Sequence, residues 1–154
     1  ILRHFGSPRR FFAAHSHELK KVEGLGEKRA KKIIEVGVGR SPYTALLLQK
    51  LLPKTELKVV DVDKEAVEEL RKIGLKAFVD DLTNPNLEIY RGADLIYSIR
   101  PPFELIPNIA SLGARIGSDV LIAPLSEDAH LSNLSGWRML RLGEASIYVL
   151  EKAL

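Results

Sequence analysis

Cysteine is absent from this chain of 154 residues. Without thiols the protein has no disulfides, no thiolate zinc sites and no cysteine nucleophile, a composition that is compatible with a reducing compartment or a hot one. No apolar run approaches the roughly 18 residues needed to span a bilayer, and no charged-then-apolar leader opens the chain. We therefore expect a cytoplasmic protein without membrane contact. Because the chain opens at Ile1 rather than at a methionine, we also expect a fragment.

Metal-binding patterns are missing as well. His4, His15 and His17 are spaced too irregularly for a metal site, so we expect capping or surface roles for them and no bound metal. What the chain does have is a hydrophobic fraction of 45%. That fraction is typical of a globular protein, and the length suits one domain with room for a small appendage.

The net charge of +3 conceals an asymmetry between the two parts of the chain. Residues 1–32 hold nine lysines and arginines against three glutamates, whereas residues 33–154 hold fourteen basic against seventeen acidic residues. A basic patch at one end is expected of a nucleic-acid-binding protein, although short solvated basic faces also occur without a partner.

The hydrophobic pattern changes at Ile33. Before it, short helical segments separated by Gly6 and Gly24 predict an all-helical end. After it, apolar runs alternate with helical periodicity, which predicts βαβ units and a mostly parallel sheet. We expect strands over 33–37, 57–62, 75–80, 93–99 and 118–124, helices over 42–52, 64–74 and roughly 103–115, and a closing antiparallel hairpin from 137–143 and 145–152.

The stretch EVGVGRS, residues 35–41, places two glycines where the first strand meets the first helix. Gly37 and Gly39 allow a tight turn and let a ligand approach the free N–H groups of the helix start. Asp61 ends the next strand about twenty residues on, where a carboxylate can accept hydrogen bonds from ribose hydroxyls. Asp80 and Asp81 follow the third strand at the same rim. The alternative is that the glycines merely turn a strand into a helix and the acids are surface residues.

This order of motifs resembles the S-adenosylmethionine-dependent methyltransferases, which have a Rossmann-like sheet between helical layers. The resemblance implies an α/β three-layer sandwich that binds S-adenosylmethionine. It assigns Glu35, Gly37 and Gly39 to the methionine-side loop. It assigns Asp61 to the ribose and Asp80 or Asp81 to the adenine amino group. Ser41 stands where many members have a third glycine, which narrows the loop.

A closer resemblance joins IIEVGVGR, VVDVD, VDDLTNPNLEIYRGADLIYSIRPP and LIAPLS. Together these runs are similar to an archaeal group with a methyltransferase-like fold, uncharacterised protein family 0146, over about 33–152. The run ADLIYSIRPPFEL is the most specific part. This resemblance implies a fold and a ligand site rather than a reaction.

The residues that leave the fourth strand form the predicted substrate side. Ser98, Arg100, Pro101 and Pro102 stand where methyltransferases of this fold place substrate-facing residues. Arg100 would be a cation at the mouth of the site that can hold a carboxylate or phosphate in a bidentate grip. In the alternative interpretation the prolines only end the strand and Arg100 is solvated. No Asn-Pro-Pro-aromatic pattern is present, so amino methylation of bases or glutamine is not supported.

The stretch VEGLGEKRAKKI, residues 22–33, fits a helix-hairpin-helix. Gly24 and Gly26 would present backbone N–H groups to a nucleic-acid phosphate, and Lys28, Arg29 and Lys32 on the following helix would add non-specific attraction. Alternatively, the Gly-Leu-Gly run is only a tight turn between packed helices.

Residues 1 to about 33 resemble the end of the tandem helix-hairpin-helix domain of XPF- and Hef-type nucleases. The runs HFGS, F-x-A and VEGLGEKRA arrive in the order that this domain has. The resemblance implies that nucleic acid, DNA in particular, is the partner. The first of the two hairpins is missing, and no E-R-K-x-x-x-D nuclease motif occurs, so the chain is not expected to cut DNA.

Both glycine motifs use Ile33 and Ile34. We assign these residues to the strand, because the hairpin needs its helix only to about Lys31 or Lys32. The predicted domains are then a partial helix-hairpin-helix over 1–32 and a Rossmann-like domain over 33–154. Two functions follow from this division. One is an S-adenosylmethionine-binding, methyltransferase-like protein with a nucleic-acid-binding segment, and the other is a non-catalytic DNA-binding or accessory module of DNA repair with a degenerate Rossmann domain.

Overall fold

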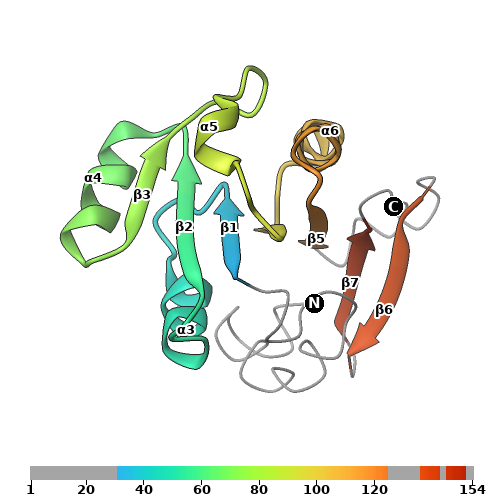
Figure 1. Ribbon diagram of the computed structural model, residues 1–154, viewed down its shortest axis with the longest axis horizontal. Helices are drawn as coiled ribbons and strands as arrows, with labels where there is room; N and C mark the ends of the chain where they lie inside the picture. Colours follow the sequence, from blue (N-terminus) through green and yellow to red (C-terminus); the bar gives the residue numbers. More distant parts are fainter. Residues whose placement is uncertain (1–30, 125–135, 143–144, 152–154) are drawn as a thin grey trace.

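The computed structural model describes residues 31–124, 136–142 and 145–151 (Figure 1). Strands and helices alternate up to the fifth strand, and two further strands follow. The elements are β1 Lys32–Val36, α3 Tyr43–Leu51, β2 Glu56–Asp61, α4 Lys64–Lys72, β3 Lys76–Val79, α5 Leu87–Tyr90, β4 Leu95–Ile99, the 3-10 helix η1 Phe103–Leu105, α6 Ile106–Ile116, β5 Asp119–Ala123, β6 Arg138–Leu142 and β7 Ala145–Leu150. None of these helices is long and apolar enough to cross a membrane.

The strands form one seven-stranded sheet in the order β3-β2-β1-β4-β5-β7-β6. The first five strands are parallel, whereas β7 runs antiparallel to both β5 and β6. This arrangement confirms the predicted α/β fold, a mostly parallel sheet with a C-terminal antiparallel pair of strands. Strand order reverses direction between β1 and β4. In open parallel sheets such a reversal leaves a crevice at the carboxyl ends of the two strands, which is where ligands bind.

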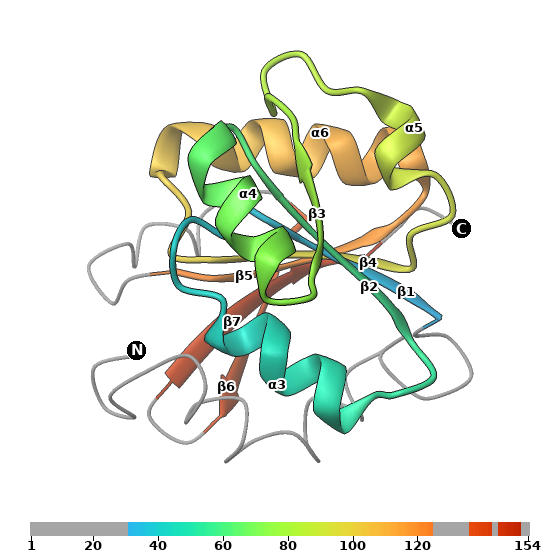
Figure 2. The same ribbon diagram turned by 90° about the vertical axis from the view of Figure 1, so that its left-hand side faces the viewer.

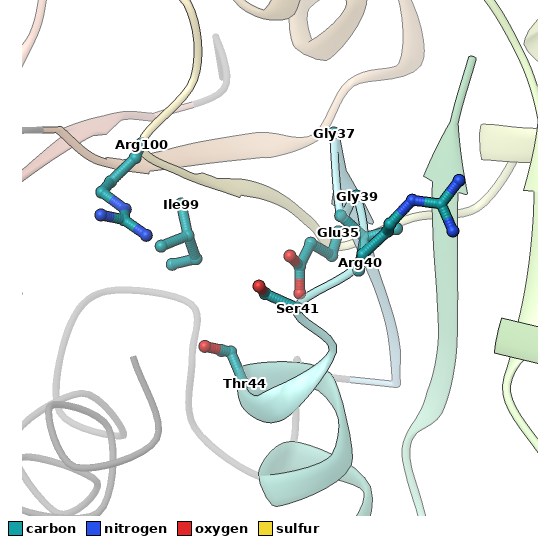
Figure 3. Close-up of a pocket in the computed structure, with 9 residues that line it drawn as sticks. Glu35, Gly37, Gly39, Arg40, Ser41, Thr44, Ile99 and Arg100 are labelled. Carbon is teal, nitrogen blue, oxygen red and sulfur yellow. The ribbon is translucent and has the colours of Figure 1, made fainter. Parts of the chain in front are cut away.

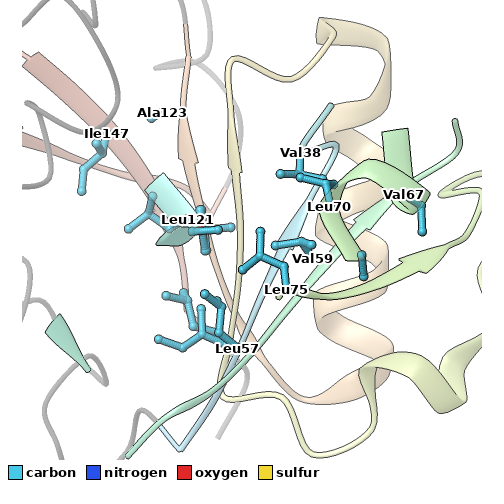
Figure 4. Close-up of a cluster of buried hydrophobic side chains, with 14 of the residues drawn as sticks. Val38, Leu57, Val59, Val67, Leu70, Leu75, Leu121, Ala123 and Ile147 are labelled. Carbon is cyan, nitrogen blue, oxygen red and sulfur yellow. The ribbon is translucent and has the colours of Figure 1, made fainter. Parts of the chain in front are cut away.

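Each face of the sheet is covered by helices (Figure 2). On one face, a cluster of buried side chains extends from Val67 and Leu70 of α4 through Val59 to Leu121 of β5, and leucines of α3 lie against it (Figure 4). On the other face, Ile34, Ile96 and their neighbours pack against α5 and α6. Both faces of the central strands are buried, which explains why these strands appear in the sequence as continuous apolar runs rather than alternating ones.

Local sequence explains where the helices begin and end. The Asp63 carboxylate caps α4 by accepting hydrogen bonds from the N–H groups of Glu65 and Ala66. Gly117 ends α6 with a φ of 80°, a conformation that glycine adopts without strain. Gly113 lets α6 approach the sheet, because a Cβ atom there would lie 2.3 Å from Val120 Cγ2.

Within the described residues the expected elements agree with the structure except at three places, and the helical segments predicted before residue 31 lie outside those residues. β1 begins at Lys32, so this lysine belongs to the strand and its predicted placement on the hairpin's helix is wrong. Ile33 and Ile34 lie in β1, as predicted. The short helix α5 was not predicted, although Asn86 caps it by accepting a hydrogen bond from the Glu88 N–H. A 3-10 turn opens the segment predicted as one helix over 103–115.

Candidate functional site

A cavity of about 380 Å³ lies at the carboxyl ends of β1 and β4, where the strand order reverses. Its walls are Glu35 of β1, residues 37–41 of the following loop, Thr44 of α3, and Ile99 and Arg100 at the end of β4 (Figure 3). The loop between β1 and α3 therefore lies beside Ile99 and Arg100 at the end of β4, which are about sixty positions away in the sequence. This is the crevice where the topology predicts a ligand.

The two glycines of the loop adopt conformations that other residues avoid. Gly37 has a φ of 70° and Gly39 a φ of 59°. The loop is fixed to β2, because the Gly37 N–H donates to the Val60 carbonyl over 2.9 Å. A Cβ atom on Gly39 would meet no heavy atom within 4 Å. The glycines therefore provide a backbone turn that leaves open space beside Gly39, as a cofactor loop requires.

Asp61 connects this loop to the end of β2. Its Oδ2 atom accepts a hydrogen bond of 2.8 Å from the Gly39 N–H, and its Oδ1 atom accepts one of 2.9 Å from the Asp63 N–H. The carboxylate thus holds the glycine loop in place from the neighbouring strand. It stands beside the cavity rather than in its wall, so its predicted contact with a ribose stays a prediction.

Glu35 is a buried carboxyl group in the wall of the cavity, with 2% of the residue exposed. Its Oε1 atom accepts a hydrogen bond of 2.7 Å from the hydroxyl of Tyr97, the residue paired with it on β4. Burial raises the pKa of Glu35 to about 7, and the negative charge of Asp61 adds to this effect, while the hydrogen bond from Tyr97 opposes it. The same burial, together with the charge of Glu35, raises the pKa of Tyr97. Near neutral pH the Glu35 carboxyl is therefore poised between its charged and neutral forms.

Of the four residues predicted on the substrate side, the structure places one in the cavity wall and three outside it. Arg100 lines the cavity, and its backbone N–H donates to the Ala123 carbonyl over 2.8 Å. Ser98 is buried, and its hydroxyl donates to the Val36 carbonyl over 2.8 Å. Pro101 is buried and Pro102 precedes η1. Among these four residues Arg100 is the one that the cavity brings together with the glycine loop.

Asp80 and Asp81 lie after β3, away from the cavity wall. Asp80 accepts hydrogen bonds from the Tyr90 hydroxyl over 2.6 Å and from the Asn86 N–H over 3.0 Å. Asp81 is exposed and accepts two hydrogen bonds from Thr83, which lower the pKa of its carboxyl group. These bonds stabilise the segment that leads to α5, and the assignment of either acid to an adenine stays a prediction.

A model of the Uncharacterised protein family (UPF0146) matches residues 20–152. The chain belongs to this family. The match begins thirteen residues before Ile33, so the Gly-Leu-Gly run lies inside the region that the family shares. The UPF0146 protein of Methanocaldococcus jannaschii is 38% identical over 108 residues, which cover 70% of this chain and 77% of that protein. The UPF0146 protein of Pyrococcus furiosus is 37% identical over 136 residues, which cover 84% of this chain and 99% of that protein.

Solved structures show the same fold as this UPF0146 chain. The plantazolicin methyltransferase BpumL in complex with SAH has a TM-score of 0.60 at 22% identity, over 83% of this chain and 53% of BpumL. A chain of a fibrillarin/Nop5p complex has a TM-score of 0.65 at 12% identity, over 95% of this chain and 83% of that one. MtNAS in complex with MTA and tNA has a TM-score of 0.61 at 19% identity, over 94% of this chain and 62% of MtNAS. The UPF0146 chain therefore has a Rossmann-like, methyltransferase-type fold and spans about half the length of BpumL.

Tyr97 and Thr44 are polar residues of the site that were not predicted from the sequence. The pairing of Tyr97 with Glu35 could not be predicted without knowing that β1 and β4 are neighbours, because the two residues are 62 positions apart in the sequence. Thr44 stands in the first turn of α3, and its position just after the glycine loop was the signal that could have identified it. The predicted nucleic-acid residues Gly24, Gly26, Lys28 and Arg29 lie outside the described residues. The ammonium group of Lys32 donates to the Arg91 carbonyl.

Proposed function

We propose that this UPF0146 chain binds an S-adenosylmethionine-type cofactor and acts as a methyltransferase-like protein. The observation that carries the proposal is the cavity at the strand reversal, which combines a glycine loop with the buried carboxyl of Glu35. A cofactor with a ribose and an α-amino acid part needs hydrogen-bond acceptors for hydroxyls, a carboxylate for an ammonium group, and close approach to the backbone. Asp61, Glu35 and Gly39 supply these three properties at the ends of two neighbouring strands.

The complexes of related folds support the same ligand class. BpumL was crystallised with SAH and MtNAS with MTA. SAH is the demethylated cofactor S-adenosylhomocysteine, and MTA is methylthioadenosine, which shares the nucleoside and thioether and lacks the amino acid part. In this chain, the nucleoside of either ligand would lie near Asp61, and the amino acid part of SAH would lie in the cavity. Methyl transfer would then require an acceptor at the mouth, beside Arg100.

Calorimetric titration with SAH tests the proposed function. We expect saturable binding to the intact chain, and a loss of affinity of about tenfold or more on Asp61→Ala, because this change removes a ribose acceptor and also releases the Gly39 N–H from its hydrogen bond. Glu69→Ala is the control, since this carboxylate is exposed on α4 and contacts Lys72. Absence of SAH binding at millimolar concentration, together with an inert Asp61→Ala variant, would contradict the proposal.

We also propose that residues 1–32 bind nucleic acid. The support is the concentration of basic residues at this end and the hairpin motif around Gly24 and Gly26. Phosphate contacts of this kind position a protein without reading the base sequence.

DNA binding measured by fluorescence anisotropy at several salt concentrations tests this second proposal. The pair Lys28→Gln and Arg29→Gln should weaken binding to duplex or branched DNA. It should also reduce the slope of log affinity against log salt by about 0.9 for each phosphate that the protein no longer neutralises. The pair Lys72→Gln and Lys76→Gln removes the same charge from exposed positions of the Rossmann-like domain and should have little effect. Equal effects of both pairs would show that net charge, rather than the hairpin, attracts DNA.

A further inference from the structure

Thr44 is a buried polar residue whose hydroxyl has no partner. The residue is 1% exposed. Its Oγ1 atom is buried and makes no hydrogen bond, which sets it apart from the other buried side-chain oxygen and nitrogen atoms of the described residues. Threonine hydroxyls in helices usually bond a carbonyl of the preceding turn. A buried hydroxyl without a partner costs free energy, so such a group is expected to serve a ligand. Figure 3 shows the Thr44 hydroxyl directed into the cavity.

The start of α3, where Thr44 lies, also lacks neutralising groups. The helix has nine residues, Pro42 provides no side-chain cap, and no acidic residue occurs in the first turn. The free N–H groups and the dipole of a helix start attract negative charge. In α4, by contrast, Asp63 and Glu65 already occupy the corresponding place. Within its own first turn, α3 therefore has no side chain that neutralises this positive potential, which lies beside the Thr44 hydroxyl.

Arg100 brings a full positive charge to the same space. Among the described residues other than glycine, Arg100 is the residue with a positive φ, which is 51°. The bond from its N–H to Ala123 and the buried Pro101 that follows hold this conformation. Figure 3 shows the Arg100 side chain extending toward the cavity, while the guanidinium of Arg40 points away from it. Arg40 instead lies within 3.4 Å of Asp63 and 3.6 Å of Glu65.

From these features we infer that Arg100, Thr44 and the start of α3 form an oxyanion subsite in the cavity. The subsite takes a carboxylate or phosphate group, with a bidentate contact from the guanidinium and a hydrogen bond from the hydroxyl. Glu35 faces the same cavity and suits an ammonium group, so a ligand that carries both charges spans the two. The identity of this ligand as a cofactor rests on the proposed function, whereas the oxyanion subsite itself does not.

The oxyanion can have two sources, and two probes distinguish them. One source is the carboxylate of the cofactor's own amino acid part, which SAH has and MTA lacks. The other is an acidic group on a separate molecule that accepts the methyl group, for which inorganic phosphate is the probe. Dissociation constants for SAH and MTA are measured on the free protein, and the constant for phosphate is measured with and without saturating SAH.

We expect Arg100→Gln to weaken SAH binding by about tenfold or more and Thr44→Val by severalfold, with MTA binding unchanged. This result assigns the oxyanion to the cofactor. If SAH binding is unchanged and phosphate binding is weakened to the same extent, the oxyanion belongs to a second molecule, and the subsite stands. Thr44→Val keeps the shape of the side chain and serves as the second variant if Arg100→Gln lowers the melting temperature.

Arg115→Gln is the matched control, because it removes the same charge from an exposed side chain of α6 that is not part of the cavity wall. The inference is overturned if neither SAH nor phosphate binding changes in the Arg100 and Thr44 variants, or if Arg115→Gln weakens binding as much as Arg100→Gln does. A wild-type protein that binds neither SAH nor MTA would refute the proposed function instead. In that case the phosphate titration of the free protein alone decides whether the subsite exists.

Discussion

Replacing Glu35 by glutamine is expected to raise the free energy of unfolding by about 3 kcal/mol at pH 8 and to leave it nearly unchanged at pH 4. The folded protein raises the pKa of this carboxyl from 4.5 to about 7, and each unit corresponds to about 1.36 kcal/mol. Below pH 4.5 the carboxyl is protonated in the folded and unfolded states alike. Between pH 4.5 and 7 the unfolded chain releases a proton that the folded chain keeps, so stability falls as the pH rises.

Glutamine keeps an oxygen that can accept the Tyr97 hydroxyl and cannot ionise. Chemical unfolding curves at pH 4, 6 and 8 measure the difference between the variant and the wild type. Glu69→Gln is the control, since it makes the same chemical change at an exposed position of α4 outside the cavity wall. A gain from Glu35→Gln that is equal at all three values would show that burial does not perturb the carboxyl. Tyr97→Phe should extend the loss of stability to higher pH, because the bond that lowers the pKa is removed.

The fold was predictable because local patterns and sheet topology agree. Strands buried on both faces appear as apolar runs such as those around Ile33 and Ile96, and the intervening helices have polar faces. Parallel strands joined by helices leave few arrangements, so the alternation itself indicated a mostly parallel sheet. The short helix α5 was not predicted because four residues give no periodicity. β1 starts one residue earlier than predicted because Lys32 favours no element strongly.

The site was less predictable, because its pairings join distant positions. Glycines at 37 and 39 are a local signal, and so is the acid at the end of the next strand. The Glu35–Tyr97 pair depends on β4 lying beside β1, an order that periodicity does not specify. The position of Thr44 just after the glycine loop is a local signal, whereas the burial of its hydroxyl without a partner is a property of the folded structure alone. The candidate site therefore consists of contacts that form only after the sheet has assembled.

The affinity for SAH is expected to rise about tenfold between pH 6 and pH 8. Glu35 lines the cavity, and an ionised carboxylate binds the ammonium group of the ligand far better than a neutral carboxyl does. With a pKa of about 7, roughly a tenth of the protein carries the charge at pH 6 and roughly nine tenths at pH 8. Because only the charged form binds well, the apparent affinity follows this fraction. Calorimetric titrations at pH 6, 7 and 8 measure the change.

Two comparisons assign this pH dependence to the pairing of Glu35 with an ammonium group. MTA lacks the ammonium, so its affinity should stay constant over the same range. Glu35→Gln should bind SAH with the low affinity of the protonated wild type at every pH, because its amide carries no charge. An equal rise for MTA, or for SAH in the Glu35→Gln variant, would place the titrating group elsewhere in the chain. The stability and binding experiments then measure opposite effects of one group, since the Glu35 charge that destabilises the free protein above pH 7 would be the charge that binds the ammonium group of SAH.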